Sequence, residues 1–247
     1  MKVPFRRLVS SAEKFVEVLL YPSFCEICRA FLERPHEKVI CRECQEKIKP
    51  WAYSYCLCCG RFFEGAGEPH LCRDCLERTP PFVKHRSCAR YEGIIKDVIL
   101  LYKYRGFEIL GQYLGDFVGR TLGVEEDLWP GVEAIIPVPL HPAKEKKRGF
   151  NQARVLARRL SKIKNIKLIE KRLVKVKNIP PQTSLEADER ARNVRGAFRV
   201  RKPEELQSKI VLLVDDVYTT GSTLRECSSV LKKAGVKEVR AVTVAQA

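Results

Sequence analysis

The chain has 247 residues, and its 46 Lys and Arg residues outnumber its 30 Asp and Glu residues, so the formal net charge is +16. This length suits one small module and one α/β domain, and no apolar run is long enough to span a bilayer. The apolar stretch at residues 15–21 is short, contains Glu17 and lacks a small-residue cleavage site, so no secretory leader is expected. We therefore expect a cytoplasmic protein.

Eight of the 11 cysteines form two quartets, and the second quartet repeats the first at an offset of 31 residues. The flanking residues repeat too, because CEICRAFLE aligns with CLCCGRFFE. Paired Cys-x-x-Cys motifs are typical of tetrahedral Cys₄ zinc sites, and a module this small needs metal to fold. The sequence predicts a first domain at residues 1–80, an N-terminal helix followed by a double zinc ribbon, whose two structural zinc ions are held by Cys25, Cys28, Cys41, Cys44 and by Cys56, Cys59, Cys72, Cys75.

Other chemistries compete with zinc for such cysteines. Disulfides need an oxidising compartment, which the lack of a leader disfavours. An iron–sulfur cluster also uses four cysteines, although the symmetric spacing favours zinc, and a redox Cys-x-x-Cys motif does not need four copies. A single metal site built from half of the ligands stays open beside two sites. Cys58, Cys88 and Cys227 have no partner by spacing and are expected to be ordinary thiols.

Residues 81–247 are expected to form one α/β domain. Apolar residues at helical spacing predict a helix at residues 93–106, and a second helix is expected at residues 108–122. A strand that runs into PVPLH at residues 137–141 precedes a helix from about Asn151, and residues 239–245 form a last buried strand. The polar segment at residues 180–198 has no apolar periodicity and predicts a mobile loop. His141 is expected to be structural, with ligand contact as the alternative.

Residues 211–223 read VLLVDDVYTTGST and carry the most specific signal. The aliphatic run at residues 209–214 predicts a strand buried in a parallel sheet, with Asp215 and Asp216 at its carboxyl end. The small, hydroxyl-rich turn that follows opens a helix over residues 223–234, closed by Gly235. Such a turn places backbone N–H groups at the positive end of a helix, which suits a phosphate, while the carboxylates can accept ribose hydroxyls or hold the waters of Mg²⁺. The ligand implied is a ribose 5-phosphate.

VLLVDDVYTTGST resembles the phosphoribosyl pyrophosphate (PRPP) motif of type I phosphoribosyltransferases, and YKYRG and PVPLH…RGFNQ resemble strings of the ComF family of competence-associated proteins. The resemblance implies an α/β fold, a type I phosphoribosyltransferase-like parallel sheet behind the ribbon, and PRPP bound with Mg²⁺. It makes residues 180–198 a hood over PRPP, with Gln182, Thr183, Arg190 and Asn193 at family-like positions. The expected PRPP-binding residues are Asp215, Asp216, Thr219, Thr220, Gly221, Ser222, Thr223, Arg148 and Lys147.

Two function classes remain open at this stage. The family resemblance implies a role in DNA uptake during natural competence, with single-stranded DNA and competence proteins as partners; the alternative is a transferase that moves phosphoribose from PRPP to an unidentified acceptor. The segment at residues 144–202 holds 20 basic and 5 acidic residues, and this field would attract a polyanion. Trp51, Tyr53 and Tyr55 could stack bases, although a small core is the expected use. A glutamine-dependent amidotransferase is not expected, because the first cysteine, Cys25, lies inside a quartet.

Overall fold

The computed structural model describes residues 23–32, 39–65, 67–179 and 192–247. The chain divides into two compact units, Met1–Lys49 and Pro50–Ala247. The sequence placed a domain boundary after residue 80, whereas here the second Cys quartet shares a unit with the sheet. No helix in the described part of the chain is long and apolar enough to cross a membrane.

The two Cys quartets lie in loops that repeat each other in structure as well as in sequence. In the first unit, Phe24 and Phe31 form an isolated β-bridge and helix α2 (Arg42–Glu46) follows; in the second, Tyr55 and Phe62 form the bridge and helix α3 (Arg73–Glu77) follows. Each of these elements lies 31 residues after its counterpart, so the internal repeat inferred from the cysteines is confirmed in the backbone.

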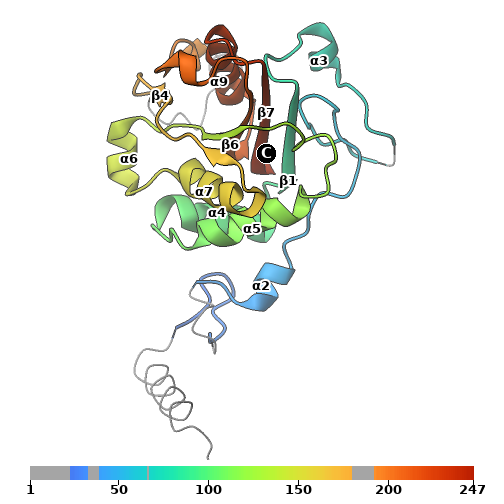
Figure 1. Ribbon diagram of the computed structural model, residues 1–247. Coiled ribbons are helices and arrows are strands. Elements are labelled where there is room, and N and C mark those ends of the chain that lie inside the picture. Colours follow the sequence, from blue (N-terminus) through green and yellow to red (C-terminus); the bar gives the residue numbers. More distant parts are fainter. Residues whose placement is uncertain (1–22, 33–38, 66, 180–191) are drawn as a thin grey trace, which may run out of the picture. The chain divides into compact units, whose positions relative to one another are not determined.

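A five-stranded parallel sheet forms the centre of the second unit, with the order β1-β7-β6-β2-β3 (Figure 1). Its strands are β1 (Lys84–Arg90), β2 (Ala134–Pro137), β3 (Lys167–Leu168), β6 (Ile210–Tyr218) and β7 (Glu238–Gln246). A separate antiparallel pair joins β4 (Leu173–Lys175) to β5 (Phe198–Val200), and a 3₁₀ helix, η1 (Pro203–Glu205), precedes β6.

Helices cover both faces of this sheet. Helices α4 (Gly93–Tyr104), α5 (Leu110–Thr121) and α7 (Gln152–Lys164) lie together on one face, and α9 (Ser222–Lys233) lies on the other (Figure 1). The short helix α6 (Pro142–Arg148) follows β2 and was not predicted. Strand β6 is buried from Val211 to Val214, as expected for a strand covered on both faces.

The second Cys quartet packs directly against β1 through a buried histidine. His85 is fully buried, its Nδ1 lies 2.8 Å from the Cys59 carbonyl oxygen, and its Nε2 lies 3.0 Å from the Thr243 hydroxyl. A carbonyl can only accept, so Nδ1 carries the proton. Gly60 has φ +65°, and a Cβ there would stand 2.4 Å from the His85 carbonyl oxygen, so only glycine permits this close approach. The quartet therefore forms part of the layer that covers the sheet.

Candidate functional site

The predicted acids, Asp215 and Asp216, lie where β6 extends beyond the end of the neighbouring strand β2. On the β2 side, pairing of β6 ends at Val214, which faces Pro137; on the β7 side, pairing continues from Asp215 opposite Thr243 to Tyr218 opposite Gln246. The sequence placed the end of the strand at residue 214, so the acids sit inside β6 rather than after it. Because β2 has already ended, the edge beside them is open on that side, where ligands of parallel sheets bind.

Asp216 is paired with a lysine that the sequence analysis could not assign. Lys103, in the last turn of α4, lies with its Nζ 2.8 Å from Asp216 Oδ1, and the two side chains are 15% and 12% exposed. Burial alone would lower the pKa of Lys103, but the Asp216 carboxylate outweighs it and the pKa rises. Lys103 therefore stays charged and holds Asp216 in place. The YKYRG string at residues 102–106 was the only sequence signal for this pair.

Asp215 has a strongly perturbed carboxyl group. Burial raises its pKa and the neighbouring Asp216 raises it further, from 3.8 to about 7, although the side chain keeps some solvent contact. The Asp216 N–H donates to Asp215 Oδ1 at 2.9 Å, and Lys103 and Lys175 lie near enough to oppose part of the rise. The carboxyl group thus gains and loses its proton near neutral pH.

The turn after β6 has the form that a phosphate site requires. Gly221 has φ +74° directly before α9, and a Cβ there would lie 2.4 Å from the Tyr218 hydroxyl. The Thr220 hydroxyl donates to Ser222 Oγ at 3.0 Å, and Thr223 lies in the first turn of the helix. The Ser222 N–H donates to Thr220 Oγ1 at 3.4 Å, and the first N–H groups of a helix have no partner within the helix, so they suit an anion. The structure brings the predicted turn residues together with both acids.

Basic side chains gather beside the acids on the β2 side. Burial lowers the pKa of Lys144, and the positive charges of Arg148, Lys175 and Lys103 lower it further, which places these four cations in one cluster. Arg148 is half-buried, donates to Gln152 Oε1 at 3.0 Å, and is a predicted member of the site. Lys147, the other predicted member, is exposed. Lys144 and Lys175 were not predicted.

Of the remaining predicted residues, His141 has a structural role, and most of the hood lies outside the described part of the chain. His141 caps α6, because its Nδ1 accepts the Ala143 N–H at 3.3 Å, so it is structural as expected. Gln182, Thr183 and Arg190 lie outside the described residues, as does most of the predicted hood. Asn193 is exposed just before β5.

Part of the basic charge at residues 144–202 is neutralised by ion pairs. Four arginines of this segment form ion pairs, and two of the acids that they use, Asp116 and Glu205, come from outside it. The pairs are Arg154–Glu145, Arg158–Glu170, Arg159–Asp116 and Arg172–Glu205. Arginines in such pairs contribute little to the binding of a polyanion, so that role falls to the other basic residues of the segment.

Both Cys quartets have the geometry of a tetrahedral metal site. The Sγ atoms of each quartet lie within 4.8 Å of one another, and the pairs Cys25–Cys44, Cys28–Cys41 and Cys59–Cys72 are 3.8, 3.6 and 3.7 Å apart. Four zinc–sulfur bonds of about 2.3 Å in a tetrahedron place the sulfurs about 3.8 Å apart. The residues present therefore fit two zinc ions, which would tie the two ends of each loop together.

Backbone groups support the thiolate form of one ligand in each quartet. The Cys41 N–H donates to Cys25 Sγ at 3.4 Å, and the Cys72 N–H donates to Cys56 Sγ at 3.3 Å. Burial alone would raise the pKa of these thiols, but the backbone hydrogen bonds lower it to about 6 for Cys25 and about 7 for Cys56. Cys88 and Cys227 are fully buried and Cys58 is half-buried, and none of them joins a quartet.

Comparison with known proteins gives matches to both parts of the chain. Residues 146–247 match the family model of the phosphoribosyl transferase domain, and residues 16–76 match that of the double zinc ribbon domain. The N-terminal double zinc ribbon and the phosphoribosyltransferase-like parallel sheet, both expected from the sequence, are thus confirmed.

Three of the relatives that this chain resembles illustrate the match. Competence protein F of Haemophilus influenzae is 41% identical over 47% of this chain and 51% of its own length. Competence protein ComFC of Streptococcus pneumoniae is 28% identical over 64% of this chain and 66% of its own length. DNA utilization protein YhgH of Escherichia coli O6:H1 is 34% identical over 44% of this chain and 47% of its own length. The chain therefore spans about half the length of two of these relatives and about two thirds of the third.

Metal analysis of single Cys variants should separate the two quartets. Purified protein should contain about two zinc ions per chain, and Cys25→Ser and Cys59→Ser should each lose about one. Only Cys59→Ser should lower the unfolding temperature of the sheet-containing unit, because Cys59 contacts the buried His85. Elemental analysis and calorimetry measure both effects. Iron in place of zinc, or equal destabilisation by the two variants, would contradict this assignment.

Replacing Asp215 should change stability in a pH-dependent way. The folded-state pKa of about 7 lies above the usual 3.8, so the ionised carboxylate destabilises the fold above pH 7, and this cost fades as the pH falls towards 4. Asp215→Asn should therefore raise the unfolding temperature at pH 8 and leave it unchanged at pH 4. Asp216→Asn, which breaks the Lys103 ion pair, is the matched control and should lower it at pH 8. A lower unfolding temperature of Asp215→Asn at pH 8 would contradict the claim that the ionised Asp215 carboxylate destabilises the fold.

Proposed function

We propose that the chain is a member of the ComF family, that it binds PRPP with Mg²⁺ at the end of β6, and that it acts in the handling of DNA during natural competence. The observation that carries the proposal is the meeting of two carboxylates, a glycine turn before α9 and a cluster of four cations at one sheet edge. The names of the relatives, which refer to competence and to DNA utilization, support the biological role.

Each group of side chains has a separate task toward PRPP. The turn at residues 219–223 binds the 5-phosphate through N–H groups and hydroxyls. Asp215 and Asp216 accept hydrogen bonds from the ribose hydroxyls, and carboxylate oxygens are also the ligands that Mg²⁺ prefers. The cluster that contains Lys144 and Arg148 attracts the pyrophosphate, with Arg148 able to offer paired donors. Bound Mg²⁺ would neutralise part of the pyrophosphate charge.

Removing both carboxylates should weaken PRPP binding. Asp215→Asn/Asp216→Asn keeps the shape of the side chains but removes charged acceptors, and the loss should be at least about 1.5–3 kcal/mol, more than tenfold in affinity. Titration calorimetry with Mg²⁺ and PRPP measures it. Glu204→Gln, an exposed acid on η1, is the control and should bind as the unaltered protein does. Equal affinity in the double variant would reject the phosphoribose site.

Binding of single-stranded DNA should depend steeply on salt. Log affinity should fall with log salt at a slope of about −0.7 per phosphate contact, without base preference. Lys146→Gln/Lys147→Gln, two exposed lysines at the end of α6, should weaken binding and make the slope shallower by about 1.4 if both contact phosphate. Fluorescence anisotropy with a labelled oligonucleotide tests this. PRPP should compete if the strand also uses the cluster around Arg148. Affinity that is flat in salt, or absent, would remove direct DNA binding from the proposal.

A further inference from the structure

The second Cys quartet has a fifth cysteine beside it in the chain. Cys58 directly precedes Cys59, whereas the corresponding position of the first quartet, 31 residues earlier, is Ile27. Cys58 is half-buried, and each of the four quartet residues in this part of the chain is 6% exposed or less. Cys58 is therefore the cysteine that solvent reaches most readily around the second quartet, and the first quartet has no thiol at the same position.

Cys58 contacts both the quartet and the sheet. A hydrogen bond joins its side chain to that of Cys75, and its thiol donates to the Phe82 carbonyl oxygen at 3.8 Å. The Cys58 carbonyl oxygen accepts the His85 N–H at 2.8 Å. Burial raises the pKa of the Cys58 thiol, and the hydrogen bond to Cys75 opposes that rise. Cys58 is not one of the four sulfurs that converge on the metal position, so it is a thiol held next to a ligand rather than a ligand itself.

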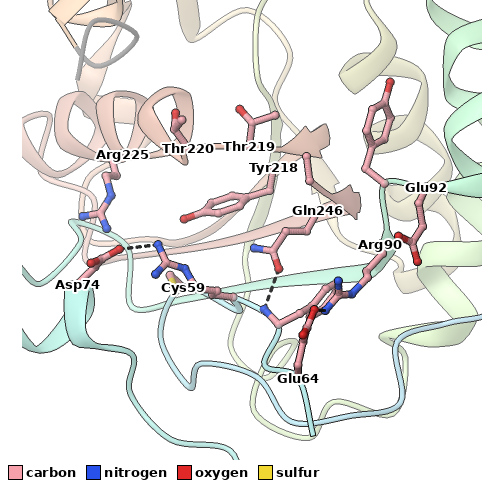
Figure 2. A pocket seen from close by; sticks show the side chains of 14 residues that line it. Cys59, Glu64, Asp74, Arg90, Glu92, Tyr218, Thr219, Thr220, Arg225 and Gln246 are labelled. Atoms are coloured by element: carbon pink, nitrogen blue, oxygen red, sulfur yellow. Dashed lines mark hydrogen bonds and ion pairs between the residues drawn. The ribbon is translucent and has the colours of Figure 1, made fainter. Parts of the chain in front are cut away.

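A cavity of about 470 Å³ brings solvent to the second quartet (Figure 2). Cys59 and Asp74 line it on the side of the Cys loop and α3, and Tyr218 and Arg225 line it on the side of β6 and α9. Cys75 directly follows Asp74 on α3. Solvent therefore reaches this loop both at Cys58 and from the cavity, and a small neutral molecule such as hydrogen peroxide fits the space.

Cys75 is the quartet member that is best placed to form a disulfide with Cys58. Adjacent residues such as Cys58 and Cys59 have Cα atoms about 3.8 Å apart, closer than the separation of about 4.4 Å at which relaxed disulfides begin. Cys75 lies on a separate element, α3, and its side chain is already hydrogen-bonded to Cys58. A Cys58–Cys75 bond would remove one of the four ligands of the second site, because a metal ligand must be a thiolate.

We propose that Cys58 is a redox-active thiol, and that a peroxide converts Cys58 and Cys75 into a reversible disulfide that releases the metal of the second quartet. The Cys58 sulfur attacks one peroxide oxygen, the O–O bond breaks, and the leaving oxygen takes the thiol proton and departs as water, so that Cys58 becomes a sulfenic acid. The Cys75 sulfur, which bound zinc keeps as a thiolate, then attacks the Cys58 sulfur. The S–O bond breaks and hydroxide leaves with its electron pair. Two sulfurs are thus oxidised while one peroxide is reduced, and two equivalents of a small thiol reverse the change by exchange.

Oxidation at Cys58 would also act on the turn at residues 219–223. The loop holds the buried His85 through two backbone carbonyls, those of Cys58 and Cys59. The His85 ring stacks on Tyr218 at 4.2 Å, and Gly221 fits against the Tyr218 hydroxyl. A loop that has lost its metal no longer fixes His85, so the disulfide should weaken PRPP binding. This last effect rests on the proposed PRPP site, whereas the disulfide and the loss of metal do not.

Treatment of the full-length, zinc-loaded protein with hydrogen peroxide tests the site. Mass spectrometry of non-reduced peptides should show a Cys58–Cys75 disulfide, and a chromogenic chelator should detect about one zinc ion per disulfide, because one Cys₄ site holds one ion. A small thiol with added zinc should restore both. The Cys25→Ser variant, which should retain only the second zinc, isolates this site. Adding Cys58→Ser to it should keep that zinc bound at the peroxide dose that empties Cys25→Ser alone, whereas Cys88→Ala, at a fully buried thiol outside the quartets, should not protect it.

The outcomes separate failure of this inference from failure of the PRPP proposal. Zinc loss that is as fast with Cys58→Ser as without it would overturn the redox site, and so would a disulfide that joins Cys58 to a cysteine other than Cys75. Peptide mapping of the unaltered protein needs no variant, so it decides the question even where Cys58→Ser folds poorly. Titration calorimetry with PRPP and Mg²⁺ before and after peroxide should show weaker binding in the oxidised protein. Absence of PRPP binding before oxidation would sink the PRPP proposal and leave the disulfide and zinc measurements to judge the redox site.

Discussion

The arrangement of the site depends on one mismatch in strand length: β6 continues past the last residue that pairs with β2, while β7 accompanies it to the end. This one-sided pairing keeps Asp215 and Asp216 in extended conformation, so their side chains leave opposite faces of the strand. Asp216 then meets Lys103 from α4, and Asp215 faces the side of Lys175 and α9. The same mismatch opens the sheet edge on the β2 side, where the cation cluster lies.

The second Cys loop acts as part of the fold of the sheet-containing unit. His85 and Arg86 of β1 are buried, and buried polar groups need hydrogen-bond partners. The loop supplies them through backbone carbonyls: Cys59 for His85, and Leu57 for Arg86 at 3.1 Å. A loop with exposed carbonyls can do this, whereas a helix, which uses its own carbonyls, cannot. Metal ligation gives such an irregular loop the rigidity of a regular element.

The sequence predicted what short-range patterns encode. The cysteine spacing, the turn at residues 219–223 and most helices follow from local motifs, and α9 begins one residue from its expected start. Strand β1 was not predicted, because KHRSCAR has no apolar alternation and is buried only through its tertiary partners. The places of Lys103 and Lys175 beside the acids were not predicted either, because these lysines lie more than 100 and 35 residues away in the sequence and reach the acids only through the fold. The extent of β6 depends on β7, a pairing that no local pattern reports.

A line of buried contacts joins the second Cys quartet to the phosphate turn. The Cys59 carbonyl accepts from His85, the His85 ring stacks on Tyr218 at 4.2 Å, and a Cβ on Gly221 would meet the Tyr218 hydroxyl. Burial lowers the pKa of His85 to about 3, so the ring stays neutral and its hydrogen bonds do not change across physiological pH. Because Tyr218 also lines a cavity of about 470 Å³, the quartet supports both the turn at residues 219–223 and one wall of that cavity. A shift of the loop would therefore alter the turn and the cavity wall together, which gives a physical reason for a zinc ribbon to belong to the unit that holds the sheet.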